Sequence, residues 1–254
     1  MAASVDSAPM AVNLTKGQWV DRAWQRLQFA VLPPHCLLCS QRSASPRDLC
    51  DECAGDLPRN GLCCPRCALP LQTPAPLCGE CLDREPPFQI TLAPFVYAHP
   101  LDQLMMRFKF GHSLAAGRVL SELWLAALRA LPLPRPQVLV PVPLHASRLR
   151  ERGYNQALEL ARPLARELSI PLRASLLVRH RATSAQTDLD ADARRRNVRG
   201  AFGVAENAPL PAHVAIVDDV MTTGTTLREC AQTLRRAGVA RVDVWALARA
   251  PKPR

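Results

Sequence analysis

The chain has 254 residues, an ordinary apolar content and a net charge of +10, and none of its apolar runs approaches the ~20 residues that a bilayer crossing needs. It is therefore predicted to be globular, with one or two domains and no transmembrane segment. Only three of the basic residues are lysines, and the arginine excess suits a phosphorylated ligand or nucleic acid, although biased codon usage would give the same composition.

Residues 1–32 are predicted to form an N-terminal tail and one helix. Residues 1–13 are small and polar, which is typical of a disordered end. Residues 14–31 carry apolar side chains at helical spacing, namely Trp19, Val20, Ala23, Trp24 and Leu27. We expect this helix to pack on the protein itself, the alternative being a membrane-surface element. No basic segment precedes an apolar one, so a cytoplasmic location is expected rather than secretion.

Four CxxC pairs mark residues 33–84 as a separate module. Ten residues separate the first pair from the second, and ten again separate the third from the fourth. The eight cysteines are Cys36, Cys39, Cys50, Cys53, Cys64, Cys67, Cys78 and Cys81. Two pairs complete the tetrahedral four-thiolate site that zinc prefers, so the spacing predicts a double zinc ribbon with up to two structural Zn²⁺ ions. The metal would replace the core that a ~45-residue segment cannot build by itself.

Other interpretations of the cysteines stay open. Disulfides or redox chemistry are the alternatives, but paired cysteines without a secretory signal favour metal in a reducing compartment. The first CxxC pair is expected to join the second, although interleaved pairing of the first with the fourth is not excluded. Cys63 is predicted to be a spare thiol.

Residues 88–254 are predicted to form a parallel α/β domain. After Pro86 and Pro87, the pattern indicates strands at 88–98 and 138–142, with helices at 101–110 and 114–131 between them. A further helix reaches about Leu168, and Pro163 is expected to kink or split it. Strands are also expected at 201–204 and 239–247.

A basic segment follows the strand at 138–142, where a loop is expected. It contains Pro143, Leu144, His145, Arg148 and Arg152. Ligands of open α/β sheets bind at the carboxyl ends of strands, and two arginines four residues apart suit pyrophosphate or nucleic-acid phosphate. The alternative is a solvated basic face.

Residues 179–197 are polar and charged and lack apolar periodicity. They are predicted to form a long mobile loop followed by a short arginine-rich helix or turn. Long loops inside compact domains are often lids that exclude water from a reactive intermediate. A disordered surface loop is the alternative.

The most informative stretch is VAIVDDVMTTGTTL, residues 214–227. Four apolar residues predict a buried parallel strand, which should end at Asp218 and Asp219. A hydroxyl-rich turn follows, made of Thr222, Thr223, Gly224, Thr225 and Thr226, and then a helix ending near Gly238. A helix N-terminus binds phosphate, and the adjacent carboxylates can accept hydrogen bonds from ribose hydroxyls.

This stretch resembles the phosphoribosyl pyrophosphate (PRPP) motif of type I phosphoribosyltransferases. Together with the cysteine module, the segment from Arg148 to Gln156 and the segment containing Gln186, Arg194, Arg195, Asn197 and Phe202, it resembles the ComF family, which includes competence protein ComFC and GntX-like relatives. The resemblance covers about residues 36–249. It implies a double zinc ribbon joined to a type I phosphoribosyltransferase-like parallel-sheet domain, acting in DNA uptake and natural transformation with competence-helicase-type partners.

The resemblance also implies roles for individual residues. Asp218 and Asp219 would be catalytic, holding the ribose partly through Mg²⁺, and residues 222–226 would hold the 5′-phosphate. Residues 143–152 would lie near the pyrophosphate, and Gln186, Arg194, Arg195 and Asn197 would belong to the lid. Purine-salvage relatives have an acid where this chain has Thr222, and threonine cannot share the proton of a base, so 6-oxopurine salvage is disfavoured.

Three functions are compatible with the sequence. The first is a protein of the DNA-uptake machinery that binds PRPP and single-stranded DNA. The second is an active phosphoribosyltransferase on an unidentified acceptor. The third is a zinc-ribbon adaptor whose transferase domain is a relic.

Overall fold

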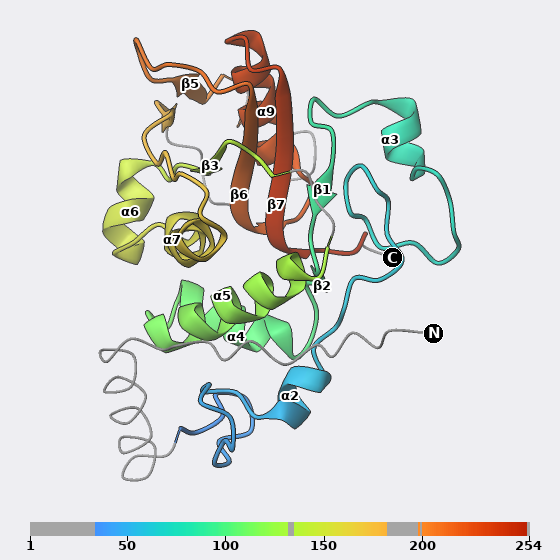
Figure 1. The fold of residues 1–254 in the computed structure, drawn as a ribbon, viewed down its shortest axis with the longest axis vertical. Helices are drawn as coiled ribbons and strands as arrows, with labels where there is room; N and C mark the ends of the chain where they lie inside the picture. Colours follow the sequence, from blue (N-terminus) through green and yellow to red (C-terminus); the bar gives the residue numbers. More distant parts are fainter. Residues whose placement is uncertain (1–33, 132–134, 182–197, 199, 253–254) are drawn as a thin grey trace, which may run out of the picture.

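The structure, a computed structural model, describes residues 34–131, 135–181, 198 and 200–252 (Figure 1). The predicted N-terminal helix and the four predicted lid residues, Gln186, Arg194, Arg195 and Asn197, lie outside the described residues.

A five-stranded parallel sheet forms the centre of the molecule, which confirms the predicted α/β class. Its strands are β1 (Thr91–Leu92), β2 (Phe95–Val96), β3 (Val138–Pro141), β6 (His213–Met221) and β7 (Arg241–Arg249). The order is β1-β7-β6-β3, and β2 also pairs with β7. The segment predicted as one strand at 88–98 thus forms two short strands, and both pair with β7.

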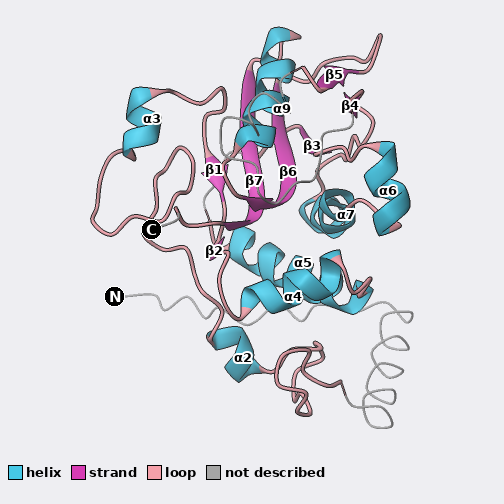
Figure 2. Cartoon of the chain, turned by 180° about the vertical axis from the view of Figure 1, so that it is seen from behind, coloured by secondary structure: helices cyan, strands magenta, loops and turns pink. Residues whose placement is uncertain are grey.

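Helices cover both faces of the sheet. Four of them are α4 (Leu101–Lys109), α5 (Leu114–Arg129), α7 (Gln156–Leu168) and α9 (Thr225–Arg236). Successive residues of a strand point to opposite faces. Accordingly, Val214 and Ile216 of β6 share a core with α9, whereas Ala215 and Val217 share a core with α4, α5 and α7. The result is a three-layer sandwich, seen from behind in Figure 2.

One prediction between β3 and α7 was wrong, and one of the two outcomes expected at Pro163 is excluded. The segment expected to be a loop contains a short helix, α6 (Ala146–Arg152), which ends at Gly153 in the left-handed conformation with φ 74°. Helix α7 then runs through Pro163 without being split. Its buried residues Leu160 and Leu164 lie on both sides of the proline, so packing of this face outweighs the lost hydrogen bond.

The cysteine module divides between the two faces. Cys36, Leu49 and Leu57 share the core of α4 and α5, and the short helix α2 (Asp51–Gly55) lies beyond those helices in Figure 1. Cys64, Cys67, Cys78 and Cys81 instead share the core of α9, and α3 (Gly79–Asp83) lies on the β1 side of the sheet. Each half of the module therefore packs on a different layer.

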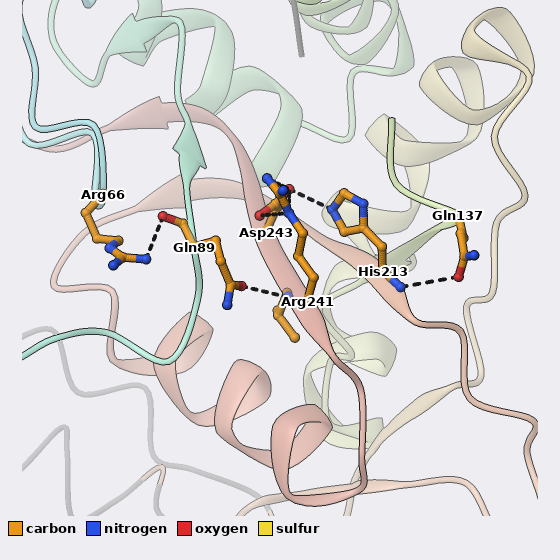
Figure 3. Close-up of polar contacts among 7 residues, drawn as sticks. Arg66, Gln89, Gln137, His213, Arg241 and Asp243 are labelled. Atoms are coloured by element: carbon orange, nitrogen blue, oxygen red, sulfur yellow. Dashed lines mark hydrogen bonds and ion pairs between the residues drawn. The ribbon is translucent and has the colours of Figure 1, made fainter. Parts of the chain in front are cut away.

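A polar network closes the amino edge of the sheet (Figure 3). The buried carboxylate of Asp243 lies 2.7 Å from His213 Nε2 and 3.2 Å from Arg241 Nε. Gln89 accepts a hydrogen bond from the Val242 amide, and Arg66 of the cysteine module donates to the Gln89 carbonyl. These contacts link the starts of β6 and β7 to the cysteine module. The separate antiparallel pair, β4 (Leu177–Arg179) and β5 (Phe202–Val204), lies beside the sheet.

Candidate functional site

The predicted ligand-binding residues lie at the carboxyl edge of the sheet, where β3 and β6 end. The expectation that β6 stops at its two acids was wrong, because the strand continues to Met221. Backbone pairing with β7 persists at Asp218, Val220 and Met221, opposite Ala246, Ala248 and Arg249. The two carboxylates are consequently held on a rigid strand rather than on a loop.

Lys109 pairs with one of these acids. Its Nζ lies 2.8 Å from Asp219 Oδ2, and both side chains are largely shielded from solvent. Lys109 is the last residue of α4, about 110 residues away in the sequence. The sequence analysis did not identify it, and the only available signal was that lysine is rare in this chain.

The acid pair and Lys109 perturb one another. Burial, and then the adjacent charge of Asp219, raise the pKa of Asp218 to about 7. Burial by itself favours the neutral amine of Lys109, but the carboxylates of Asp219 and Asp218 raise its pKa above the ordinary value. Asp218 is thus poised to gain or lose a proton near neutral pH, while Lys109 carries a positive charge.

The raised pKa of Asp218 predicts a pH-dependent stability difference. The unfolded carboxyl ionises near pH 4 whereas the folded one ionises near 7, so ionisation favours the unfolded state as pH rises across this window. We expect Asp218→Asn to be more stable than the unmodified protein at pH 8, by about 1 kcal/mol or more, with the advantage shrinking toward pH 5. Denaturant unfolding of both proteins measures this difference, and metal effects cancel because the cysteines are the same. An equal difference at both pH values would contradict the assignment.

Two arginines extend the charged cluster. Arg179, at the end of β4, interacts electrostatically with Asp218 and with Arg148. Burial and then the like charge of Arg152 lower the pKa of Arg148, as expected for guanidinium groups crowded together. Arg152 also donates to Gln156 Oε1 at 3.3 Å and lies over the Phe110 ring. Arg179 was not among the predicted ligand residues.

The other residues of the predicted pyrophosphate segment serve local structure. Pro143 and Leu144 connect β3 to α6 and are half-buried. His145 is the N-cap of α6, where its Nδ1 accepts the Ser147 amide at 3.2 Å. A direct phosphate contact of His145 stays a prediction.

The turn after β6 has the features of a phosphate loop. Gly224 is the N-cap of α9, with φ 73°, and contributes no side chain to cap the helix. A Cβ at this position would come within 2.5 Å of the Met221 methyl group. Thr223 Oγ1 lies 2.9 Å from Thr225 Oγ1, while Thr222 is exposed. The Thr225 amide donates to Thr223 Oγ1 at a long 3.5 Å, so an anion at the start of α9 would compete with this hydroxyl for it.

A cleft of about 540 Å³ adjoins this loop, between α3 of the cysteine module and α9. Its lining has both charge signs and includes Thr223, Thr225, Arg84, Arg228, Arg236, Glu80, Glu85 and Glu229. The cysteine module thus lies within reach of the phosphate loop.

The eight predicted metal ligands gather into two groups. Cys36, Cys39, Cys50 and Cys53 form one and Cys64, Cys67, Cys78 and Cys81 the other, each with its sulfur atoms within 4.8 Å of one another. The pairing is sequential rather than interleaved. Sulfur atoms in tetrahedral zinc sites are about 3.8 Å apart, and the separations of 3.7 Å for Cys39–Cys50 and 3.5 Å for Cys67–Cys78 agree.

The protonation behaviour of the thiols also suits a cation. Burial would raise the pKa of Cys36 and Cys64, but backbone N–H groups directed at their sulfur atoms lower it to about 6 and about 7. Burial and neighbouring thiols raise the pKa of Cys53 and Cys81. A divalent metal would stabilise all four thiolates of a group at once. The two groups are structural zinc sites, closed by four protein ligands each.

The fold and the cysteine groups define a class: a double zinc ribbon joined to a phosphoribosyltransferase-type parallel sheet. The double zinc ribbon domain family matches residues 27–82, and the phosphoribosyl transferase domain family matches residues 155–254. DNA utilization protein YhgH of Salmonella typhi is 39% identical over 223 residues, which is 86% of this chain and 98% of that protein. Competence protein F of Haemophilus influenzae is 38% identical over 79% of this chain and 96% of that protein. The chain belongs to the ComF family.

Among solved structures, adenine phosphoribosyltransferase from Leishmania tarentolae is similar over 63% of this chain and 76% of that one, at 17% identity and a TM-score of 0.35. A likeness at this level does not assign site residues. Within the part of the chain that the structure describes, no helix combines the length and apolar character needed to cross a bilayer.

Proposed function

We propose that this protein binds PRPP at the carboxyl edge of its sheet and single-stranded DNA on its basic surfaces, as a cytoplasmic component of DNA uptake and natural transformation. The names of its relatives, which refer to competence and to DNA utilization, support the DNA role. A competence helicase and other uptake proteins are the partners this role implies. The PRPP role rests on the glycine-initiated, hydroxyl-rich start of α9 beside the paired acids.

Different described residues would bind different parts of PRPP. The amides opening α9, with Thr223 and Thr225, would hold the 5′-phosphate. Asp218 and Asp219 would hold the ribose hydroxyls, and their carboxylate oxygens fit Mg²⁺, which would neutralise charge on the pyrophosphate. Lys109 and Arg179, which interact with the acids, and Arg148, which interacts with Arg179, would face the anionic leaving group.

A substitution at Gly224 tests the phosphate loop. We expect Gly224→Ala to weaken PRPP binding by about ten-fold or more, because Cβ strains the left-handed residue and crowds Met221. Gly238→Ala is the matched control, since Gly238 also has a positive φ of 108° but faces open space at the other end of α9. Calorimetric titration with PRPP and Mg²⁺ measures both. Equal PRPP affinities of the two variants would show that the loop does not bind PRPP.

The DNA role is tested by calorimetric titration with single-stranded DNA. Contacts to phosphates release counterions, so affinity for single-stranded DNA should fall steeply as salt rises. PRPP affinity measured with and without the DNA then gives the coupling between the two ligands. A DNA affinity that stays constant from low to moderate salt would contradict the proposed contacts to DNA phosphates.

Phosphoribosyl transfer to an unidentified acceptor is a second candidate, favoured by the position of both acids on a rigid strand. It predicts pyrophosphate release that needs PRPP, Mg²⁺ and an acceptor, and that is lost in Asp219→Asn. No turnover across a panel of nucleobases and amines would count against it. A relic domain in a zinc-ribbon adaptor predicts no PRPP binding at all.

A further inference from the structure

Arg249, the last residue of β7, is a buried cation without a carboxylate partner among the described residues. It is 4% exposed. Its guanidinium donates instead to backbone carbonyls: Nε to Cys67 at 3.0 Å, and Nη1 to Met221 at 3.0 Å, to Ala250 at 2.7 Å and to Thr222. Burying a guanidinium is costly unless hydrogen bonds and nearby negative charge compensate for it, so the four carbonyls and the neighbouring cysteine group indicate a specific structural task.

One end of this contact lies in the second zinc site. The Cys67 carbonyl belongs to the turn that starts at Cys64, which is closed by the Ala68 amide donating to the Cys64 carbonyl at 2.8 Å. All four cysteines of this group are buried. Because the metal would bind Cys64 and Cys67 together, it fixes the turn and thereby the direction of the Cys67 carbonyl.

The other end lies in the phosphate loop. In a trans peptide the C=O and the following N–H point in opposite directions. By holding the Met221 and Thr222 carbonyls, Arg249 turns the amides of Thr222 and Thr223 away from itself. The glycine N-cap contributes no side chain to the loop, and Arg249 adds to the local contact between Thr223 and Thr225.

A second link joins the same parts. Glu80, between Cys78 and Cys81, lies 3.9 Å from Arg228 in the first turns of α9 and 3.9 Å from Lys252. The second zinc site therefore contacts the phosphate-binding region from two directions, whereas the first zinc site packs on α4 and α5.

We propose that Arg249 is a positioning residue that couples the second zinc site to the phosphate loop, so that PRPP affinity depends on metal at Cys64, Cys67, Cys78 and Cys81 but not at the first site. This inference rests on the proposed PRPP binding. No local sequence pattern indicates this coupling, since the three parts are separated by about 30 to 180 residues.

The test compares Arg249→Met and Arg249→Lys with the unmodified protein. We expect Arg249→Met to bind PRPP about ten- to a hundred-fold more weakly by calorimetry, because it loses charged hydrogen bonds to the loop. It should still hold two zinc ions per chain. Arg249→Lys should be intermediate, because one ammonium group cannot span both sets of carbonyls. Cys39→Ser, in the exposed part of the first site, should lower zinc content without changing PRPP affinity.

Hydrogen exchange provides a readout that needs no ligand. In Arg249→Lys, amides of residues 221–226 should exchange faster while those of β3 keep their protection. Unchanged exchange in the loop together with unchanged PRPP affinity would overturn the coupling. If the unmodified protein itself does not bind PRPP, the proposed function fails, but faster loop exchange in Arg249→Lys would still support the positioning role.

Discussion

Cys64→Ala is expected to release one of two zinc ions and to lower the free energy of unfolding by about 5 kcal/mol or more, because a structural zinc site contributes its binding energy to folding. Cys64 is fully buried, and its group shares the core of β6, β7 and α9. Loss of the metal would leave three thiols without a cation in that core. The effect should therefore reach the sheet and not only the ribbon.

The adjacent Cys63→Ala provides the matched control. Cys63 is half-buried and belongs to neither metal group, so its replacement should change the unfolding free energy by less than about 1 kcal/mol. Elemental analysis gives zinc per chain, and denaturant titration gives the stability of each variant. Full zinc content in Cys64→Ala, or equal losses in both variants, would contradict the assignment of the second site.

Lys109→Met is expected to destabilise the protein by about 2–3 kcal/mol, since it leaves the partly buried charge of Asp219 beside Asp218 with no cation at 2.8 Å. The double variant Lys109→Met/Asp219→Asn should recover more than half of this loss. Replacing both members of the pair removes the uncompensated charge, whereas replacing one creates it.

A double-mutant cycle measured by denaturant unfolding isolates the pair. Arg107→Met is the control, because Arg107 lies in the same helix but is exposed. A coupling energy between Lys109 and Asp219 below about 0.5 kcal/mol would show that the ion pair is not formed in solution.

Local patterns were sufficient to predict the cysteine module, the parallel sheet and the motif at residues 214–227. The reason is that each depends on residues close in sequence: CxxC pairs at regular spacing, a run of apolar residues, and a glycine that starts a helix. The alternation of Val214, Ala215, Ile216 and Val217 between two cores follows from the same local periodicity.

The rest depended on tertiary contacts. Strand β6 passes the acids because β7 pairs with it to its end, and α7 tolerates Pro163 because one of its faces is buried. Lys109 and Arg249 reach the site from two other elements, and no nearby pattern marks them. Arg179, which was expected to begin the mobile loop, instead ends strand β4. A charged side chain acquires such a role only once the fold places a partner beside it.

The two halves of the ribbon pack on opposite layers of the sandwich. Loss of metal from the first site would accordingly act on the ribbon half that covers α4 and α5, and loss from the second site on the half that packs beside α9. The two metal ions therefore support different parts of the fold. A protein that holds only one of them would keep one half of the ribbon ordered and lose the other.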